Sequence, residues 1–310
     1  MLLNDSISNE PSSAERVMRL SMPTVAESLL CLSSCSKDEP DPGPVWPDDP
    51  GETPGEVADK PADCGNIVVA HRGGASEAGI AFPDNSIASL QYAMSLKCYA
   101  SECDIYWTKD DKVVVAHADG DYRINGLHPW EATLEQIRAA GKLANGETVP
   151  DLEMFLDEVM KAGSCTRLWL DIKNISGMSA YPINACRKAC EIIKKKKAQN
   201  FVEFICTSNA TVMASSYSYA TAVGSNIGWM ANKSASEYTQ RGYKWANLST
   251  EFMKQGGGNL TIEEFNKAGV DVSVFNADDD VTMDYYIAYA SKMKAICTNY
   301  PKKLLSKMEK

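Results

Sequence analysis

Short apolar segments rich in β-branched residues alternate with segments of helical apolar spacing from residue 66 onward. The first kind is typical of buried strands, and the second is typical of helices that pack on one face. The expected strands are Ile67–Ala70, Ser101–Tyr106, Leu168–Ile172, Phe201–Thr207, Asn226–Met230, Trp245–Leu248, Asp271–Phe275 and Ala295–Thr298. The expected helices include Ser86–Leu96, Asp151–Lys161, Pro182–Lys197, Thr261–Lys267 and Val281–Ser291.

Eight strands separated by helices, over about 240 residues, predict an α/β fold of the TIM (β/α)₈ barrel type. A doubly wound open sheet is the alternative, but no glycine-rich turn of the dinucleotide-binding type follows the first expected strand. Lys112–His117 is expected to form an additional short strand, and residues 121–150 a loop and a helix. We therefore expect a small insertion after the second strand, at about 111–150. In such barrels the active site lies at the C-terminal ends of the strands.

Residues 1–35 have the pattern of an export signal. A moderately apolar stretch ends in Leu32-Ser33-Ser34-Cys35, which resembles a bacterial lipobox whose cysteine is lipidated. Ser36-Lys37-Asp38-Glu39 follows, and it is similar to the surface-export signal of lipoproteins from the Bacteroides group. The resemblance implies an exported bacterial lipoprotein at the outer membrane, at the cell surface or in the periplasm, with Cys35 as the lipidated residue. The alternative interpretation is a disordered tail with an accidental cysteine.

Residues 36–63 contain seven of the fourteen prolines, interleaved with Asp, Glu and Gly. Such a composition buries too little apolar surface to fold, so it indicates an extended linker. The folded domain is expected over 64–310. No apolar run approaches the roughly 20 residues that span a bilayer as a helix, so a lipid anchor is the only membrane contact that we expect.

Composition and charge narrow the class of partner. Of the 310 residues, 44% are hydrophobic and 23% are charged, which is typical of a globular domain. The net charge of −10 leaves no basic surface for nucleic acid. An acidic protein can still bind an anionic substrate when a bound cation dominates the local field. Cys103, Cys206 and Cys297 lie inside expected strands and are interpreted as buried thiols; disulfide pairing among the other cysteines is left open.

Two expected strands carry acidic residues on one face. Glu102 and Asp104 alternate with an apolar position in the second strand, so both side chains point the same way. Two carboxylates on an inward face repel each other unless a cation or protons lie between them, and hard cations such as Mg²⁺ and Ca²⁺ prefer oxygen ligands. Asp171 on the third strand is placed to complete a three-carboxylate site. Lys173 shares a face with Asp171 and is placed to contact a phosphate oxygen.

Two of the three histidines border these strands. His71 ends the first strand, and His117 follows the additional strand of the insertion. Imidazole titrates near neutral pH, so two histidines beside a metal-bound phosphate suit general acid–base catalysis, one activating the nucleophile and the other protonating the leaving alkoxide. His128 lacks such a setting and is expected to be an ordinary surface residue.

Taken together, the motifs resemble those of the glycerophosphodiester phosphodiesterase family over residues 66–305. The motifs occur along the chain in the same order as in the family, and their positions agree with the expected strands. This makes the resemblance more specific than one short motif. The matching segments are His71-Arg72-Gly73, Pro83-Asp84-Asn85-Ser86, Glu102-x-Asp104, Thr108-Lys109-Asp110, Val114-Val115-Ala116-His117, Asp171-Ile172-Lys173 and Thr298-Asn299-Tyr300-Pro301.

This resemblance implies a TIM barrel in which Glu102, Asp104 and Asp171 bind a divalent cation, Ca²⁺ or Mg²⁺. It implies that His71 and His117 are the acid–base pair. The implied substrates are small glycerophosphodiesters such as glycerophosphocholine, which are cleaved to glycerol 3-phosphate and an alcohol. The free glycerol hydroxyl is the implied first nucleophile, giving a cyclic phosphate that water then opens.

The resemblance also implies that Arg72 and Lys173 contact phosphate and that Asn85 belongs to the same polar cluster. Asp171 departs from the family, because this ligand is usually Glu and the shorter side chain predicts a shifted cation, an intervening water or a lower affinity. Asn299 replaces the usual Asp and removes one charge near the barrel mouth.

Two other functions are compatible with this pattern. One is a barrel phosphodiesterase acting on lipid head groups, resembling bacterial phosphatidylinositol-specific phospholipase C or spider sphingomyelinase D, which also use two histidines. The first of these typically needs no metal, which leaves the three carboxylates unexplained. The other is a non-catalytic surface lipoprotein that binds phosphodiesters or glycans, for which the altered Asp171 and Asn299 are the best support.

Overall fold

The computed structural model describes residues 60–77, 82–161 and 163–309. The predicted export signal at 1–35, its Cys35, and most of the linker at 36–63 lie outside these residues. No helix within the described residues is long and apolar enough to cross a membrane.

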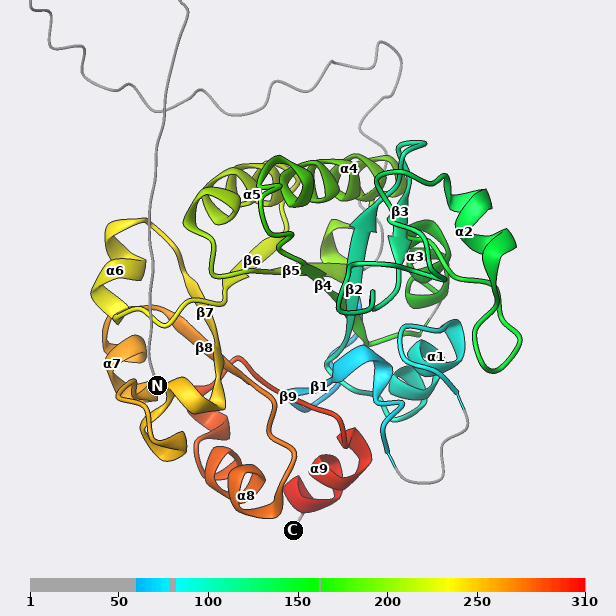
Figure 1. Cartoon of the computed structure of the whole chain (residues 1–310). Coiled ribbons are helices and arrows are strands. Elements are labelled where there is room, and N and C mark those ends of the chain that lie inside the picture. The colour runs from blue at the N-terminus through cyan, green and yellow to red at the C-terminus, as the bar shows by residue number, and fades with distance from the viewer. Residues whose placement is uncertain (1–59, 78–81, 162, 310) are drawn as a thin grey trace, which may run out of the picture. The chain divides into compact units, whose positions relative to one another are not determined.

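Eight parallel strands close into a barrel within the described part of the chain (Figure 1). The ring closes because β1 is hydrogen-bonded to both β2 and β9. This confirms the TIM barrel and excludes the open sheet. The strands are β1 Val68–Ala70, β2 Ala100–Trp107, β3 Val113–Val115, β4 Arg167–Ile172, β5 Val202–Cys206, β6 Asn226–Trp229, β7 Trp245–Ser249, β8 Asp271–Phe275 and β9 Ala295–Thr298.

Helices surround this barrel, as Figure 1 shows. Several begin at a serine or threonine whose hydroxyl accepts the backbone N–H of the third helical residue, as Ser86 does for α1. The helices are α1 Ile87–Ser95, α2 Leu134–Ala140, α3 Leu152–Val159, α4 Ala180–Lys196, α5 Ala210–Ala222, α6 Ala235–Gln240, α7 Ile262–Lys267, α8 Asp280–Ala288 and α9 Pro301–Met308. Single turns of 3₁₀ helix form at His71–Gly73, Gln199–Phe201, Thr250–Phe252, Lys254–Gly256 and Ala290–Lys292.

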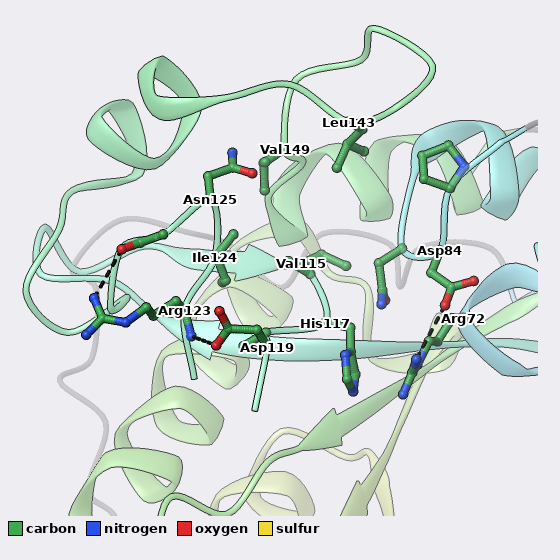
Figure 2. Close-up of a pocket in the computed structure, with 15 residues that line it drawn as sticks. Arg72, Asp84, Val115, His117, Asp119, Arg123, Ile124, Asn125, Leu143 and Val149 are labelled. Atoms are coloured by element: carbon green, nitrogen blue, oxygen red, sulfur yellow. Dashed lines mark hydrogen bonds and ion pairs between the residues drawn. The ribbon is translucent and has the colours of Figure 1, made fainter. Parts of the chain in front are cut away.

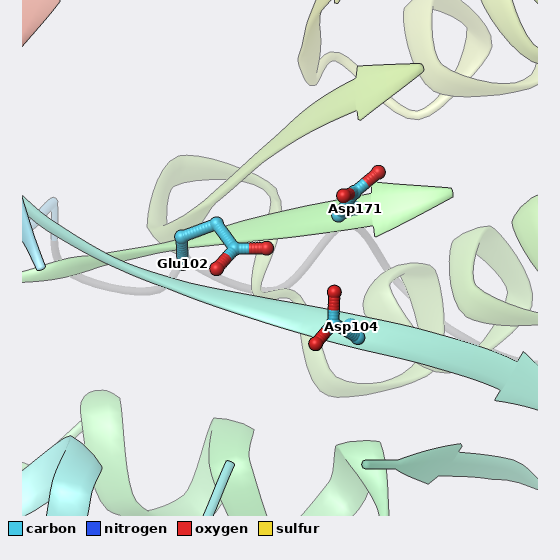
Figure 3. A group of neighbouring side chains, drawn as sticks. All are labelled: Glu102, Asp104 and Asp171. Carbon is cyan, nitrogen blue, oxygen red and sulfur yellow. The ribbon is translucent and has the colours of Figure 1, made fainter. Parts of the chain in front are cut away.

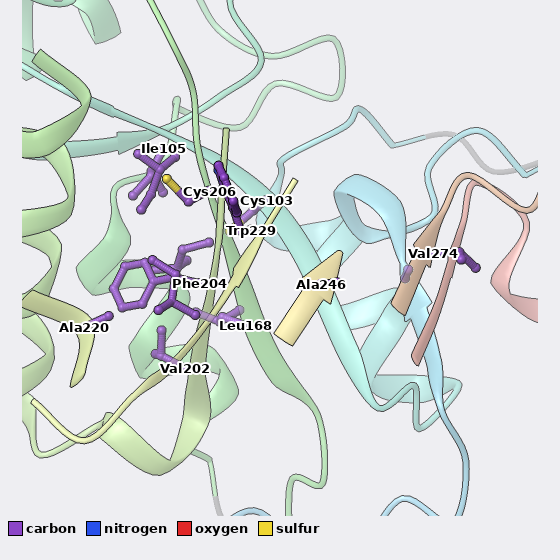
Figure 4. Close-up of a cluster of buried hydrophobic side chains, with 14 of the residues drawn as sticks. Cys103, Ile105, Leu168, Val202, Phe204, Cys206, Ala220, Trp229, Ala246 and Val274 are labelled. Carbon is purple, nitrogen blue, oxygen red and sulfur yellow. The ribbon is translucent and has the colours of Figure 1, made fainter. Parts of the chain in front are cut away.

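Alternate residues of the strands face opposite sides of the barrel wall, because side chains alternate along a strand. Outward side chains such as Phe204 and Trp229 form the main core beneath the helices (Figure 4). Inward side chains such as Trp169 and Trp245 fill the barrel interior. Cys103 and Cys206 belong to the outer core, Cys297 belongs to the inner one, and all three are buried free thiols, as predicted.

The predicted insertion follows β2. Strand β3 pairs antiparallel with the end of β2, and α2 follows it. These elements enclose a hydrophobic cluster of their own, which includes Tyr106, Val114, Ile137 and Val149. The other side of β3 is held by Val115, whose backbone N–H donates to the Pro150 carbonyl at 3.0 Å, and by a bridge between Val114 and Asp151. The course of the chain after Val115 is therefore fixed on both sides of the strand.

A buried ion pair lies at the N-terminal end of the barrel. Lys294 Nζ is 2.8 Å from Glu203 Oε1, and the two side chains are 13% and 7% exposed. Glu203 also accepts hydrogen bonds from Trp169, Tyr99 and Asn226. Burial acts to raise the pKa of Glu203, but the Lys294 ammonium and these donors outweigh it, so the carboxylate stays ionised.

We expect Glu203→Gln or Lys294→Met alone to lower the free energy of unfolding by about 3–5 kcal/mol, because each leaves a buried charge without its partner. The double variant should lose clearly less free energy of unfolding than the two single variants lose in sum, since the charges are coupled. Urea denaturation of the four proteins measures this coupling. Additive losses would show that the pair is not the stabilising unit.

A disulfide joins Cys64 to Cys165, 101 residues apart, beside the start of β4. Closing a loop of this length restricts the unfolded chain and stabilises the fold by about 2–4 kcal/mol. Cys64→Ser with Cys165→Ser is therefore expected to lower the melting temperature and the free energy of unfolding. Adding a thiol reductant should lower the stability of the original protein to that of the double variant and leave the variant unchanged; equal stability of all samples would contradict the expectation.

Candidate active site

Three carboxylates meet inside the barrel near its C-terminal end (Figure 3). Glu102 and Asp104 come from β2, and Asp171 comes from β4, where it is the register partner of Asp104. One oxygen of each lies within 4.8 Å of the other two, and all three residues are buried. Although Asp171 is shorter than the usual glutamate, it reaches the group.

The carboxylate oxygens fit a divalent cation. Oε1 of Glu102 and Oδ1 of Asp171 are buried without a hydrogen-bond partner. Burial, reinforced by Asp104, raises the pKa of Glu102 well above its usual range, and burial also raises the pKa of Asp171. Buried acidic oxygens without partners are costly unless a proton or a cation neutralises them. Ca²⁺ and Mg²⁺ both prefer such ligands, so these residues could hold either ion.

Two basic side chains border the carboxylates. Lys173 contacts Asp171, and its Nζ is 2.5 Å from Asp104 Oδ1. Arg72 Nε is 3.3 Å from Asp104 Oδ2. Burial acts to raise the pKa of Asp104, but Lys173 and Arg72 outweigh it and hold that pKa below its usual range. Both predicted phosphate contacts therefore lie beside the acidic group, where an anion would meet them.

The turn after β1 places His71 and Arg72. Arg72 has a φ of 50°, and its backbone N–H donates to Glu102 Oε2 at 2.9 Å. Gly73 and Gly74 follow with φ of 85° and 78°. A Cβ on Gly73 would lie 2.5 Å from the Ser89 hydroxyl, so glycine is required by the close approach of α1 as well as by the backbone conformation.

Asn299 and Asp278 fix the orientation of His71. The Asn299 amide nitrogen donates to Asp278 Oδ2 at 2.6 Å, which leaves its Oδ1 to accept from His71 Nδ1 at 2.7 Å. The proton is therefore on Nδ1, and Nε2 faces Glu102 Oε2 at 3.7 Å. Burial is the main cause that lowers the pKa of His71, so the neutral imidazole is favoured. The substitution of Asn for the usual Asp thus retains the hydrogen bond.

Asp278 is absent from the residues predicted for the site. It follows β8, accepts the backbone N–H of Asn299 at 2.8 Å and accepts the Thr298 hydroxyl at 2.9 Å. Its position after the end of a barrel strand is a general feature of active-site residues in this fold, and it does not distinguish Asp278 from other residues placed there.

Asn85 belongs to the cluster, as predicted. It is buried, its Nδ2 donates to Asp104 Oδ2 at 2.8 Å, and its Oδ1 accepts the Asp104 backbone N–H at 3.0 Å. These two bonds fix the end of β2 against the segment that enters α1.

His117 lies at the edge of a cavity between the barrel mouth and the insertion (Figure 2). The same cavity is lined by Arg72 and Asn85, both of which contact Asp104. His71 and His117 therefore border one acidic group. Burial lowers the pKa of His117, whereas the charge of Asp104 acts to raise it.

His128 is not the ordinary surface residue that we expected. Its side chain is 16% exposed and stacks on Trp130, with ring centroids 4.5 Å apart. The aromatic neighbour two residues later in the sequence covers it. His128 is not among the residues that line the cavity of His117.

Known proteins resemble this chain in sequence and in fold. YhdW of Bacillus subtilis (strain 168), assigned by name to the glycerophosphodiester phosphodiesterases, is 32% identical over 102 residues, which cover 30% of this chain and 40% of that relative. A glycerophosphodiester phosphodiesterase from Parabacteroides distasonis superimposes with a TM-score of 0.65 and 23% identity over 80% of this chain and 98% of that one. An Oleispira antarctica phosphodiesterase, solved with its product sn-glycerol-3-phosphate, superimposes with a TM-score of 0.61. It is 20% identical in sequence, and the match covers 79% of this chain and 97% of that one.

At these identities the solved structures show the shared barrel fold. The sequence pattern of the glycerophosphoryl diester phosphodiesterase family matches most of the chain. The match covers residues 71–303, from His71 of the site to α9. The chain therefore belongs to the glycerophosphoryl diester phosphodiesterase family of enzymes.

Proposed function

We propose that this enzyme hydrolyses small glycerophosphodiesters to glycerol 3-phosphate and an alcohol. The observation that supports the proposal most is the buried group of Glu102, Asp104 and Asp171 with both histidines at its border. The presence of sn-glycerol-3-phosphate as product in the Oleispira antarctica phosphodiesterase of the same fold adds support.

In this proposal His71 is the general base. Its Nδ1 proton is held by Asn299, so Nε2 carries the lone pair and faces the carboxylates. In the first step it accepts the proton of the attacking glycerol hydroxyl. The attack of the glycerol hydroxyl forms a cyclic phosphate, which water then opens.

His117 is the general acid. As the bond between phosphorus and the leaving oxygen breaks, the electron pair stays on that oxygen and His117 supplies its proton. His117 must be protonated at that point. Burial lowers its pKa, and the negative charges of Asp104 and of the substrate act against this lowering. The two histidines exchange roles when water opens the cyclic phosphate.

Glu102, Asp104 and Asp171 would hold Ca²⁺ or Mg²⁺. Such an ion neutralises phosphate charge and polarises the phosphorus–oxygen bonds, which explains how an acidic protein binds an anion. Arg72 and Lys173 lie beside the same carboxylates and are proposed to donate to the phosphate oxygens.

An assay of several diesters tests the proposal. We expect glycerophosphocholine or glycerophosphoethanolamine to release glycerol 3-phosphate and the free alcohol, with intact phospholipids cleaved far more slowly. Coupled detection of glycerol 3-phosphate measures this. Preferential cleavage of intact lipid would instead favour a phospholipase-like enzyme, and the absence of any hydrolysis would favour a binding protein.

We also propose that the protein is exported and anchored through Cys35. The Cys64–Cys165 disulfide supports export, because such bonds persist in oxidising compartments. Labelling with a radioactive fatty acid, and its loss in Cys35→Ser, tests the anchor.

A further inference from the structure

The cavity at His117 has a volume of about 450 Å³ and is built from two parts of the chain. Arg72 and Asn85 line it on the barrel side, and Ile124, Leu143 and Val149 line it on the insertion side (Figure 2). His117 stands where the two sides meet. The cavity is large enough for an alcohol of a few heavy atoms.

The position of His117 indicates which part of the substrate lies in this cavity. This step rests on the proposed function. If His117 protonates the leaving oxygen, that oxygen lies within hydrogen-bond distance of the imidazole. The alcohol attached to it must then extend away from the buried carboxylates. The cavity on the insertion side of His117 provides the space.

Most charges that line the cavity are already paired. Arg72 and Asp84 form an ion pair at 3.3 Å. The Arg123 guanidinium donates to Asp121 at 2.8 Å and to the Gly126 carbonyl at 3.1 Å, and Figure 2 shows it turned away from His117. These groups add little net charge to the cavity.

Asp119, unlike these groups, has a carboxylate oxygen that is left without a partner in the described part of the chain. Its Oδ1 accepts the backbone N–H groups of Asp121 and Arg123 at 2.9 and 2.8 Å, which lowers its pKa and keeps it ionised at neutral pH. Within the described residues, Oδ2 accepts no hydrogen bond and belongs to no ion pair. Asp119 lies in the same cavity as His117, separated from it along the chain by one residue.

The other walls are apolar. Val115, Ile124, Leu143 and Val149 contribute aliphatic side chains, and Asp119 is an exposed residue of the same lining. A short alkyl chain that ends in a positive nitrogen matches both features, because its methylene or methyl groups contact the aliphatic wall while the charge faces the carboxylate. A second phosphate or carboxylate on the alcohol would be repelled.

We propose that this cavity receives the leaving alcohol and that Asp119 makes it selective for an alcohol with a cationic nitrogen on a short alkyl chain. Asp119 acts on binding and takes no part in the proton transfers. A primary ammonium and a trimethylammonium share this chemistry, and the choice between them depends on contact with the aliphatic wall.

The test is a kinetic comparison of four glycerophosphodiesters. Two have cationic alcohols, aminoethyl and trimethylammonioethyl, and two have the neutral alcohols of the same shape, propyl and 3,3-dimethylbutyl. We expect KM to be about two- to fivefold lower for each cationic diester than for its neutral counterpart, the range typical of an exposed ion pair, with similar kcat. The difference should shrink at high salt, which screens exposed charges.

Asp119→Asn removes the charge and keeps the Oδ1 acceptor, so the turn is retained. In this variant the four KM values should converge to within about twofold, because the ion pair is lost. Glu131→Gln is the matched control, because Glu131 is an exposed acid of the same insertion that does not line the cavity; it should keep the original preference.

Equal KM values for cationic and neutral diesters in the unaltered enzyme would overturn the inference while the hydrolase function stands. A preference that survives in Asp119→Asn would overturn the role of Asp119. Failure to hydrolyse any of the four diesters would overturn the proposed function and this inference with it.

Discussion

His71→Ala is expected to lower kcat by about a hundredfold or more, with a small change in KM. The reason is that His71 Nε2 is the base facing the carboxylates, and a positioned general base contributes about 10²–10⁴ to the rate. Its contribution is made in the transition state, so substrate binding is little affected. Steady-state kinetics on glycerophosphocholine measure the loss.

His128→Ala is the matched control, because it removes a partly buried histidine of the insertion outside the cavity. It should change kcat by less than about threefold, within the usual effect of a substitution that makes no transition-state contact. Thermal denaturation of both variants separates loss of catalysis from loss of fold. If His71→Ala stayed folded and kept its rate, the assignment of the base would be wrong.

Removal of divalent cations is expected to lower kcat by about a hundredfold or more, corresponding to a few kcal/mol of charge stabilisation. Without an ion, a phosphodiester approaches three buried carboxylates that are only partly balanced by Lys173 and Arg72. Added Ca²⁺ or Mg²⁺ should restore the rate. Dialysis against a chelator followed by titration of each ion measures this.

Titration calorimetry with the ion alone gives a readout independent of catalysis. Glu102→Gln should weaken ion binding by about tenfold or more, because the affinity for such ions depends on the number of charged ligands and this change removes one. Glu251→Gln, an exposed acid that follows β7 at the same end of the barrel, should leave binding unchanged. Full activity of the chelated enzyme, or unchanged ion binding in Glu102→Gln, would contradict the cation site.

Much of the barrel could be predicted from local sequence. Each expected strand corresponds to an observed one with ends shifted by a few residues, because β-branched runs buried on both faces are distinctive. Helix α5 was not among the helices named from the sequence. Its Ser, Thr and Tyr residues weaken the apolar spacing, and its helical state depends on packing against α4 and β6. Closure of the barrel depends on the pairing of β1 with β9, which no local pattern encodes.

The active site, like the barrel, could be predicted only in part from local sequence. Glu102, Asp104 and Asp171 could be placed together because strand alternation and the barrel rule fix their direction. Asp278 could not, because an aspartate after a strand has no distinguishing local pattern, and its role depends on a bond to Asn299 from another strand. The pairing of Cys64 with Cys165 is likewise a tertiary fact.

The chain enters the described domain at the end of the barrel opposite the catalytic cluster. Lys60 and Pro61 border the same cavity as Glu203 and Lys294, and the Ala62 backbone N–H donates to the Ser164 carbonyl just before β4. A partner fused directly before Lys60 is therefore joined at the end of the barrel that lies away from the catalytic cluster.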